Sequence, residues 1–482
     1  MEVEEKTLLY GIIGFLWLEY FWELYLSRRQ HRIYERTVEV PLELKDILSK
    51  ETFEKARLYG LDKSSFSTLK GFLSMLISTI FILLFGFLYF WNISRDILIR
   101  FGFQGNNEII HSMVFGLLTN IYSTLISLPF GIYYTFVLEE KHGFNKQTVG
   151  FFVKDKIKAF LVGQLIMLPV IAAVVKIVRA GGDYFFFYLW LFSMIVTFFL
   201  LTVYPDYIAP LFDKYTPLPE GDLRTKIEEL ASSLQFPLYE MYVVEGSKRS
   251  VHSNAYFYGF YKKKRIVLFD TLLKDYTPIN KKDAAEKEED KAKQETQKEK
   301  VELKDEEMEG KANVDKKENK DSAEKKNNEQ KGCSDEEVIA VLGHELGHWK
   351  LNHVIKNLCI MQINLFLMFL VFGLLFQYKT MYRAFGFVDE EPVLIGFFIV
   401  LQFLFSPYNT VLGYFLTSLS RRFEFQADAF AQSLGHGKAL CDALIKLNTD
   451  NLGFPVYDPL FSKWHHSHPP LLQRLNAIQK TE

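Results

Sequence analysis

The sequence predicts a mainly α-helical integral membrane protein with seven spans and a small cytosolic α+β part. Hydrophobic residues make up 49% of the 482 residues and aromatic residues 16%, yet 24% are charged. Apolar and very polar segments must therefore alternate. Seven apolar stretches are each near or above the roughly 20 residues that cross a bilayer. The net charge of −2 provides no basic field to attract phosphates, which argues against a nucleic-acid partner.

The seven predicted spans differ in what connects them. The spans are Leu8–Leu26, Gly71–Phe90, Ile110–Val137, Ala159–Val178, Tyr184–Tyr204, Val354–Phe376 and Val393–Leu416. Lys and Arg are frequent in every second connection, namely 27–70, 138–158 and 205–353. They also follow the last span, whereas the remaining connections carry few. Because positive residues accumulate on the cytosolic side, this alternation predicts an outside N-terminus and a cytosolic C-terminus.

The first span carries two carboxylates. It follows an acidic start, which is wrong for a cleavable signal peptide, so an uncleaved membrane helix is expected. Glu19 and Glu23 are four residues apart and therefore share one helical face. They either lie near the headgroups or face a wet interior, because carboxylates in a span rarely face lipid.

Residues 205–353 form one large polar insertion, whose first part is expected to fold. Leu223–Leu234 has helical spacing, and Met241–Val244 and Arg265–Phe269 are short β-prone runs. Ser253–Phe260 and the basic turn after it predict a β-hairpin with the second run. The insertion therefore contains a small α+β unit.

The second part of the insertion changes composition sharply. From 280 to 331 it consists almost entirely of Lys, Glu, Asp, Asn and Gln, which indicates a disordered, solvated insert. Order resumes at Ser334, which fits an N-cap before an acidic first turn. The helix that starts there could run on into the sixth span.

This helix carries the motif Leu-Gly-His-Glu-Leu-Gly-His-Trp. His344 and His348 are four residues apart, so they lie one turn apart on one face and can share a zinc ion. Glu345 lies beside the first ligand, where the general base of metal-assisted hydrolysis belongs. A solvated helix that happens to carry two histidines is the alternative. The two glycines of the motif lower helix propensity, and they could leave room for a metal and a substrate.

A catalytic zinc takes three protein ligands and keeps an open position for water, so a third ligand is required. Two spans separate His348 from Glu424, which puts both on the cytosolic side. Glu424 and Asp428 are four residues apart on one helical face. Glu424 can supply the third ligand, and Asp428 can accept the N–H of a ligand imidazole. A surface helix with ordinary solvated charges is the alternative.

Other histidines have no spacing argument and are expected to be structural, namely His142, His252, His353, His465 and His466.

Three motifs together resemble the CAAX prenyl protease 1 family, the type I integral-membrane zinc metalloproteases. They are Leu342–Trp349, Ser420–Asp428 and Ser467–Pro470. The family's animal members include the prelamin-A-processing enzyme. The resemblance covers nearly the whole chain and extends to Glu139–Asn145, Asp206–Lys214, Glu245–Ser250 and His252–Gly259.

The resemblance implies a zinc site with its catalytic groups. His344, His348 and Glu424 match the zinc ligands, with one Zn²⁺ per chain. Glu345 matches the catalytic base and acid. Asp428 matches the residue that holds a ligand histidine.

The resemblance also implies the groups that hold the substrate. His468 matches a histidine that helps to hold the oxyanion and the substrate. Asn254, Ala255 and Tyr256 open the matching substrate-aligning strand, whose exposed edge can pair with an extended peptide. Arg474 could meet a substrate carboxylate or form a salt bridge at its helix end.

Members of this family fold seven helices into an α-barrel around a water-filled intramembrane chamber, with the zinc site at its cytosolic end. The implied activity is removal of the last three residues of prenylated C-a-a-X proteins. A second, upstream cut in prelamin-A-like or pheromone-like substrates is also implied. The implied location is the endoplasmic reticulum membrane and the inner nuclear membrane, in contact with the bilayer.

Two alternatives belong to other classes. One is a membrane quality-control zinc protease of the heat-shock-induced type, which shares the zinc motif. The other is a non-catalytic membrane scaffold with a structural zinc, against which the intact Glu345 argues.

The expected division of the chain follows the spans and motifs. It is 1–204 for spans one to five, 205–279 for the α+β part with its hairpin, 280–331 for the charged insert, 332–353 for the zinc-motif helix, 354–418 for spans six and seven, and 419–482 for the C-terminal part with the third ligand.

Overall fold

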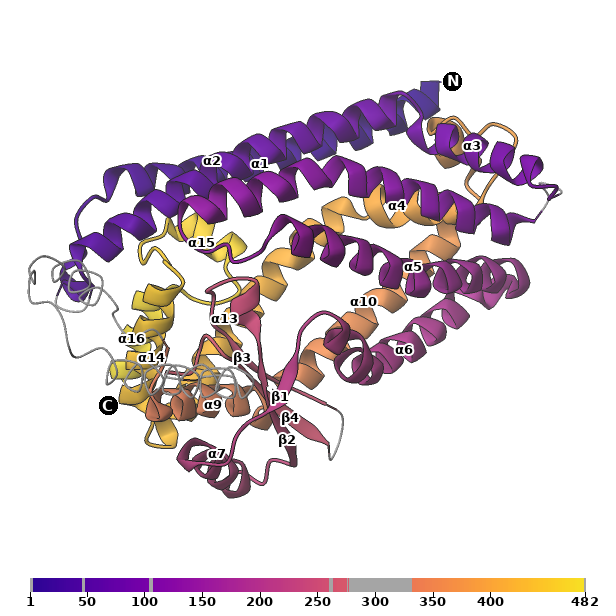
Figure 1. The fold of residues 1–482 in the computed structure, drawn as a ribbon. Coiled ribbons are helices and arrows are strands. Elements are labelled where there is room, and N and C mark those ends of the chain that lie inside the picture. Colours follow the sequence, from indigo (N-terminus) through magenta and orange to yellow (C-terminus); the bar gives the residue numbers. More distant parts are fainter. Residues whose placement is uncertain are drawn as a thin grey trace, which may run out of the picture.

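The computed structural model describes residues 3–45, 48–103, 107–259, 263–274, 276 and 332–480. Long helices run side by side, and a four-stranded sheet with shorter helices packs at one end of them (Figure 1). The predicted mainly helical membrane fold with a small α+β part is therefore confirmed. The charged insert predicted for 280–331 lies outside the described residues.

The membrane part is built from long helices and a few shorter ones. They are α1 (Val3–Arg36), α2 (Lys50–Leu83), α3 (Gly86–Arg100), α4 (Glu108–Tyr133), α5 (Val149–Ala180), α6 (Phe185–Val203), α10 (His353–Leu375), α11 (Lys379–Ala384), α12 (Val393–Phe398) and α13 (Ser406–Ser433). Among the described residues, five helical segments are long and apolar enough to cross a membrane, and the bent pair of α12 and α13 makes a sixth. The first predicted span lies in the 34-residue α1, which packs along α2 but is not one of these segments.

The bounds of the second predicted span, Gly71–Phe90, are wrong. The helix α2 already begins at Lys50 and ends at Leu83, and Phe85 has a left-handed φ of 51°. A Cβ at Gly86 would lie 2.4 Å from the ring of Phe81, so only glycine fits there. The chain therefore turns into α3, although its hydropathy is continuous.

The last predicted span is bent, and the predicted boundary between 418 and 419 falls inside one continuous helix. A π-helical turn, Ile399–Leu404, continues α12, and the chain then bends by 55° into α13. The helix α13 then runs unbroken from Ser406 to Ser433. One element therefore carries both the end of the span and Glu424.

The carboxylates of the first span face other helices. Glu19 accepts hydrogen bonds from the hydroxyls of Ser406 (2.9 Å) and Thr410 (2.5 Å). Glu23 accepts a hydrogen bond from the indole N–H of Trp464 at 2.8 Å. Both side chains therefore point into the protein, which agrees with the predicted inward position and not with one near the headgroups.

The sheet contains β1 (Tyr215–Pro217), β2 (Leu238–Val244), β3 (Ala255–Tyr258) and β4 (Lys264–Phe269), in the order β1-β2-β4-β3. The strands β3 and β4 are antiparallel, with Ala255 opposite Leu268, which confirms the predicted hairpin. The strand β3 is therefore at the edge of the sheet. The helices α7 (Asp222–Ser233) and α9 (Asp335–Lys350) share a hydrophobic core with the sheet.

The zinc-motif helix does not run on into the sixth span. Ser334 and Glu337 form a capping box at the start of α9, which confirms the predicted N-cap. After Lys350 the chain turns at Asn352, whose φ of 57° is left-handed, and α10 begins at His353.

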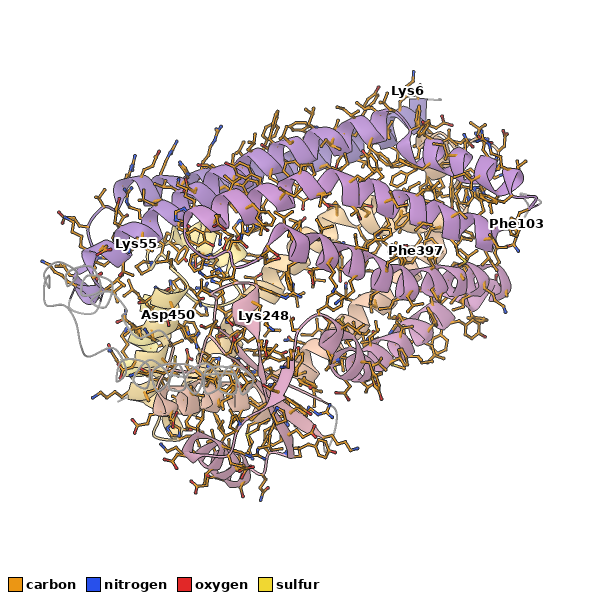
Figure 2. The ribbon with its side chains drawn as sticks, in the orientation of Figure 1. Lys6, Lys55, Phe103, Lys248, Phe397 and Asp450 are labelled. Atoms are coloured by element: carbon orange, nitrogen blue, oxygen red, sulfur yellow. The ribbon has the colours of Figure 1, made fainter. Side chains whose placement is uncertain are left out.

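Three helices complete the end of the molecule that carries the sheet. They are α14 (Gly437–Asp450), α15 (Pro459–His465) and α16 (Leu471–Gln479). Figure 2 labels Lys55, Lys248 and Asp450 toward this end, and Lys6 and Phe103 at the opposite end.

Candidate metal centre

Two helices from different parts of the chain bring three potential ligands together. On α9, the Nε2 atoms of His344 and His348 are 3.1 Å apart. Glu424 reaches them from α13. Its Oε2 lies 3.5 Å from Nε2 of His344, and its Oε1 lies 3.3 Å from Nε2 of His348. The predicted convergence of these three side chains is confirmed.

These three side chains fit a zinc ion. Two ligands about 2.0–2.1 Å from a tetrahedral zinc are separated by about 3.3 Å, close to the observed spacings. Glu424 is buried, with 3% of its surface exposed, and its carboxylate faces the two imidazoles. A buried carboxylate is costly unless a positive charge compensates it, which a zinc ion between these ligands would supply.

The glycines of the motif serve helix packing. A Cβ at Gly347 would lie 3.0 Å from the ring of Phe430 and 3.3 Å from the Cα of Ala427, both on α13. Gly343 faces Ala431 of the same helix. The prediction that these glycines leave room for a substrate is therefore wrong, since they let α13 approach α9 closely enough to deliver Glu424.

A charged pair supports His344. Its Nδ1 lies 2.8 Å from Oδ1 of Asp428, as predicted for a residue that fixes the imidazole. Arg474 donates to both oxygens of Asp428, at 2.6 and 2.9 Å. Burial lowers the pKa of His344, but hydrogen bonds to Asp428 and Glu424 outweigh it and raise this pKa to about 9. Arg474 thus forms the predicted salt bridge, behind the ligands.

A neutral pair supports His348, and sequence reasoning missed it. The Nδ1 atoms of His348 and His353 are 3.0 Å apart, and Nε2 of His353 lies 3.0 Å from the amide oxygen of Gln426. The ring of His353 stacks on Phe423 with centroids 4.0 Å apart. The sequence did contain a signal for this pair, because Phe423 and Gln426, which contact His353, both lie within the predicted motif around Glu424.

Two further predicted residues lie at the site. Burial raises the pKa of Glu345, although the neighbouring His344 and His348 lower it. A higher pKa suits a group that must take and return a proton near neutral pH. The Nδ1 of His468 lies 2.8 Å from Oε2 of Glu424, and its side chain is 69% exposed. His468 therefore marks the open side of the metal centre.

The predicted substrate strand lies against the helix that carries the histidines. Ala255 is buried in the same core as Leu346 of α9. Asn254 is exposed, and its side-chain oxygen accepts a hydrogen bond from the N–H of Ala255 at 2.8 Å. The hydroxyl of Tyr256 lies 3.2 Å from that of Tyr215. The strand β3 is thus packed beside α9.

A helical membrane protein with a His-Glu-x-x-His helix and a converging glutamate is an integral-membrane zinc metalloprotease. The family model of the CAAX prenyl protease N-terminal region, with five membrane helices, matches residues 30–214. The model of peptidase family M48 matches residues 217–482. The chain therefore belongs to the CAAX prenyl protease 1 family within peptidase family M48.

Relatives match over nearly the full length. The chain is 53% identical to the mouse CAAX prenyl protease 1 homolog, over 99% of this chain and 96% of that protein. It is 54% identical to the human homolog, over 98% and 96%. A crystal structure of S. mikatae Ste24p matches with a TM-score of 0.80 and 32% identity, over 99% of both chains.

Proposed function

We propose that this chain is an endopeptidase that removes the last three residues of prenylated C-a-a-X proteins. The observation that carries the proposal is the outer edge of β3, which pairs with no further strand of the described residues and lies beside α9, the helix of His344 and His348. A free strand edge can pair with an extended peptide and hold one carbonyl at a fixed place. The printed names of the mouse and human relatives support the substrate class.

His344, His348 and Glu424 would hold one zinc ion per chain. Bound zinc makes a water molecule acidic near neutral pH and polarises a carbonyl group. Glu345 takes the proton of the attacking water and returns it to the leaving amine. His468 donates a hydrogen bond to the carbonyl oxygen as negative charge develops there.

The supporting residues keep this arrangement in place. Asp428 accepts the N–H of His344, which orients the ring toward the metal, and Arg474 holds Asp428. Asn254, Ala255 and Tyr256 align the peptide along β3. In this proposal Arg474 orients Asp428 and does not contact the substrate.

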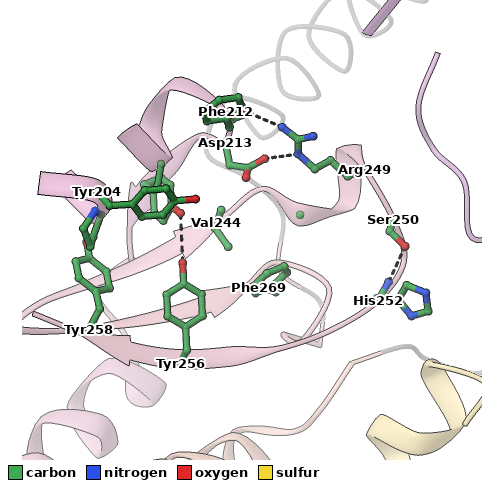
Figure 3. Close-up of a pocket in the computed structure, with 14 residues that line it drawn as sticks. Tyr204, Phe212, Asp213, Val244, Arg249, Ser250, His252, Tyr256, Tyr258 and Phe269 are labelled. Carbon is green, nitrogen blue, oxygen red and sulfur yellow. Dashed lines mark hydrogen bonds and ion pairs between the residues drawn. The ribbon is translucent and has the colours of Figure 1, made fainter. Parts of the chain in front are cut away.

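An aromatic cavity beside β3 supports a prenylated substrate. It has a volume of about 550 Å³ and lies between the end of α6 and the sheet. Figure 3 shows Tyr256 and Tyr258 of β3 pointing into it, with Tyr204 and Phe212 on its other side. Its apolar lining suits an isoprenoid chain that enters from the membrane.

The proposed location is the endoplasmic reticulum membrane and the inner nuclear membrane, with the site facing the cytosol or nucleoplasm. The alternating Lys and Arg content of the connections supports this orientation. Prenylated chains attach to the cytosolic membrane face, where such a site would meet them. A second, upstream cut would use the same strand edge and the same metal centre.

The test compares a farnesylated C-a-a-X peptide with its unprenylated twin, using the zinc-loaded full chain in detergent. We expect cleavage after the prenylated cysteine, with the unprenylated twin cleaved far more slowly. Equal cleavage of both peptides would contradict the proposal and favour a membrane quality-control protease.

A further inference from the structure

A second cavity, of about 300 Å³, adjoins the start of the substrate strand. It opens between α1, α2 and the segment 451–466. Its lining is mixed. Aromatic rings such as Tyr59 and Phe454 line it together with hydroxyl and amide groups and a single lysine, namely Ser27, Gln30, Lys63, Ser64, Ser67 and Asn451. The polar part of this lining suits an anion that accepts several hydrogen bonds.

Lys63 brings a positive charge without a directly paired carboxylate to this cavity. Its Nζ lies 4.8 Å from the centre of the Tyr59 ring, and no carboxylate of the described residues lies within 4.0 Å of it. The nearby Glu139 is already engaged. One of its oxygens accepts the Tyr59 hydroxyl at 2.6 Å, and the other lies 3.6 Å from Nε2 of His252. The ammonium group is therefore available to a ligand.

The cavity adjoins the start of β3, and one of its lining residues is near the metal centre in the chain. Asn451 lines it, and its side-chain oxygen accepts the N–H of Ser253 at 3.2 Å, just before β3 begins. His466 also lines it, two residues from His468, which contacts Glu424. A peptide that leaves the metal centre past the start of β3 would therefore enter this cavity.

The aromatic cavity offers no unpaired cation among its described lining residues. Arg249 lines it, but it donates to Asp213 at 2.6 Å (Figure 3) and to Asp155 at 2.8 Å. Tyr256 and Tyr258 of β3 make this cavity aromatic. The two cavities beside β3 thus differ in chemistry, since only the one lined by Lys63 has an ammonium group without a paired carboxylate.

We propose that Lys63 binds the C-terminal carboxylate of the substrate and so fixes the direction of the peptide. This inference rests on the proposed function. Antiparallel pairing with β3 is the more common arrangement, and it puts the carboxyl end of the peptide at the start of β3. The prenylated cysteine, on the amino side of the cleaved bond, then lies toward the aromatic cavity. The C-terminal carboxylate of a C-a-a-X substrate thereby meets Lys63, and its prenyl group meets the aromatic cavity.

The experiment uses a farnesylated C-a-a-X peptide and its C-terminal carboxamide, which lacks only the charge. For the wild-type chain with zinc, we expect kcat/KM to be roughly tenfold to a hundredfold higher for the acid, as for loss of a charge-assisted hydrogen bond. Lys63→Met should lower kcat/KM for the acid to the value for the amide, and it should leave kcat/KM for the amide unchanged. Lys63→Arg should retain part of the preference.

Lys55→Met is the matched control. Lys55 lies on the same helix, its side chain is 61% exposed, and it pairs with Glu51. This variant should keep the wild-type preference for the acid.

Two results would overturn the inference while leaving the proposed function intact. They are equal cleavage of acid and amide by the wild-type chain, and an equal loss on both peptides in Lys63→Met. If the wild-type chain cleaves neither peptide, the proposed function itself fails and the inference fails with it.

Discussion

The two histidines of the metal centre are held in contrasting ways. His344 faces the carboxylate of Asp428, which Arg474 holds with two hydrogen bonds. His348 faces the neutral ring of His353. A carboxylate both orients an imidazole and makes it a stronger ligand, whereas a neutral partner only orients it. The two supports should therefore differ in how much each contributes to metal binding.

The largest effect should come from a residue that belongs to neither support. Glu345→Gln keeps the size of the side chain and leaves Asp428 and His353 in place. We expect zinc content to stay at the wild-type level while kcat falls about 10²- to 10⁴-fold, because the proton acceptor is lost. Zinc analysis and peptidase assays on the same purified sample measure both.

Glu345→Gln also shows how far activity falls when zinc binding is intact, against which the variants of Asp428 and His353 are compared. Substantial residual activity in clean Glu345→Gln protein would refute the role of Glu345. Loss of zinc in this variant would instead show that Glu345 helps to hold the metal.

The charged support should give the next largest effect. Asp428→Asn removes the negative charge behind His344 and weakens the partner of Arg474. We expect zinc affinity to fall about 10- to 100-fold, measured by competition with a metal buffer. The control is Asp442→Asn, which changes an exposed carboxylate on α14. Equal zinc affinity in both variants would contradict the assigned role.

The pattern of the sequence accounts for the metal ligands better than for their supports. Four-residue spacing puts His344 and His348 on one face, and the order of the spans puts Glu424 on the same side. Neither argument depends on packing detail. His353 follows a left-handed turn at Asn352, so helical periodicity could not relate it to His348.

Packing also decides the features that hydropathy misses. The stretch Gly71–Phe90 is apolar throughout, yet the helix ends at Leu83 because the ring of Phe81 lies against Gly86. The glycines of the zinc motif gave a second wrong prediction for the same reason. Close approach between helices is a property of pairs of elements, and a single sequence does not state which elements pair.

The neutral support should give a smaller effect than the charged one. His353→Phe preserves the stacking on Phe423 but removes the hydrogen bonds to His348 and Gln426. We expect zinc affinity to fall by no more than about tenfold, at the low end for groups that orient a ligand. The same metal-buffer competition applies. A loss equal to that of Asp428→Asn would show that orientation, and not charge, governs both supports.

The smallest effect should come from a histidine that is half-buried without a carboxylate partner among the described residues, His466. Burial and the neighbouring His465 and Arg421 lower the pKa of His466 to about 4, the opposite of the shift at His344. An unfolded histidine titrates near about 6.5. Between these values the unfolded chain binds more protons than the folded chain, so stability is lost as the pH falls.

His466→Gln should remove this contribution. Between pH values of about 6.5 and 4, we expect the free energy of unfolding of the variant to fall less steeply with falling pH than that of the wild-type chain. The difference in slope corresponds to the uptake of at most about one proton on unfolding. Thermal unfolding followed by tryptophan fluorescence, on zinc-loaded samples at several pH values, measures the two slopes. Identical slopes would mean that His466 takes up its proton as readily in the folded chain as in the unfolded one. In that case burial alone, without a carboxylate partner, would not be enough to keep a histidine beside this metal centre neutral.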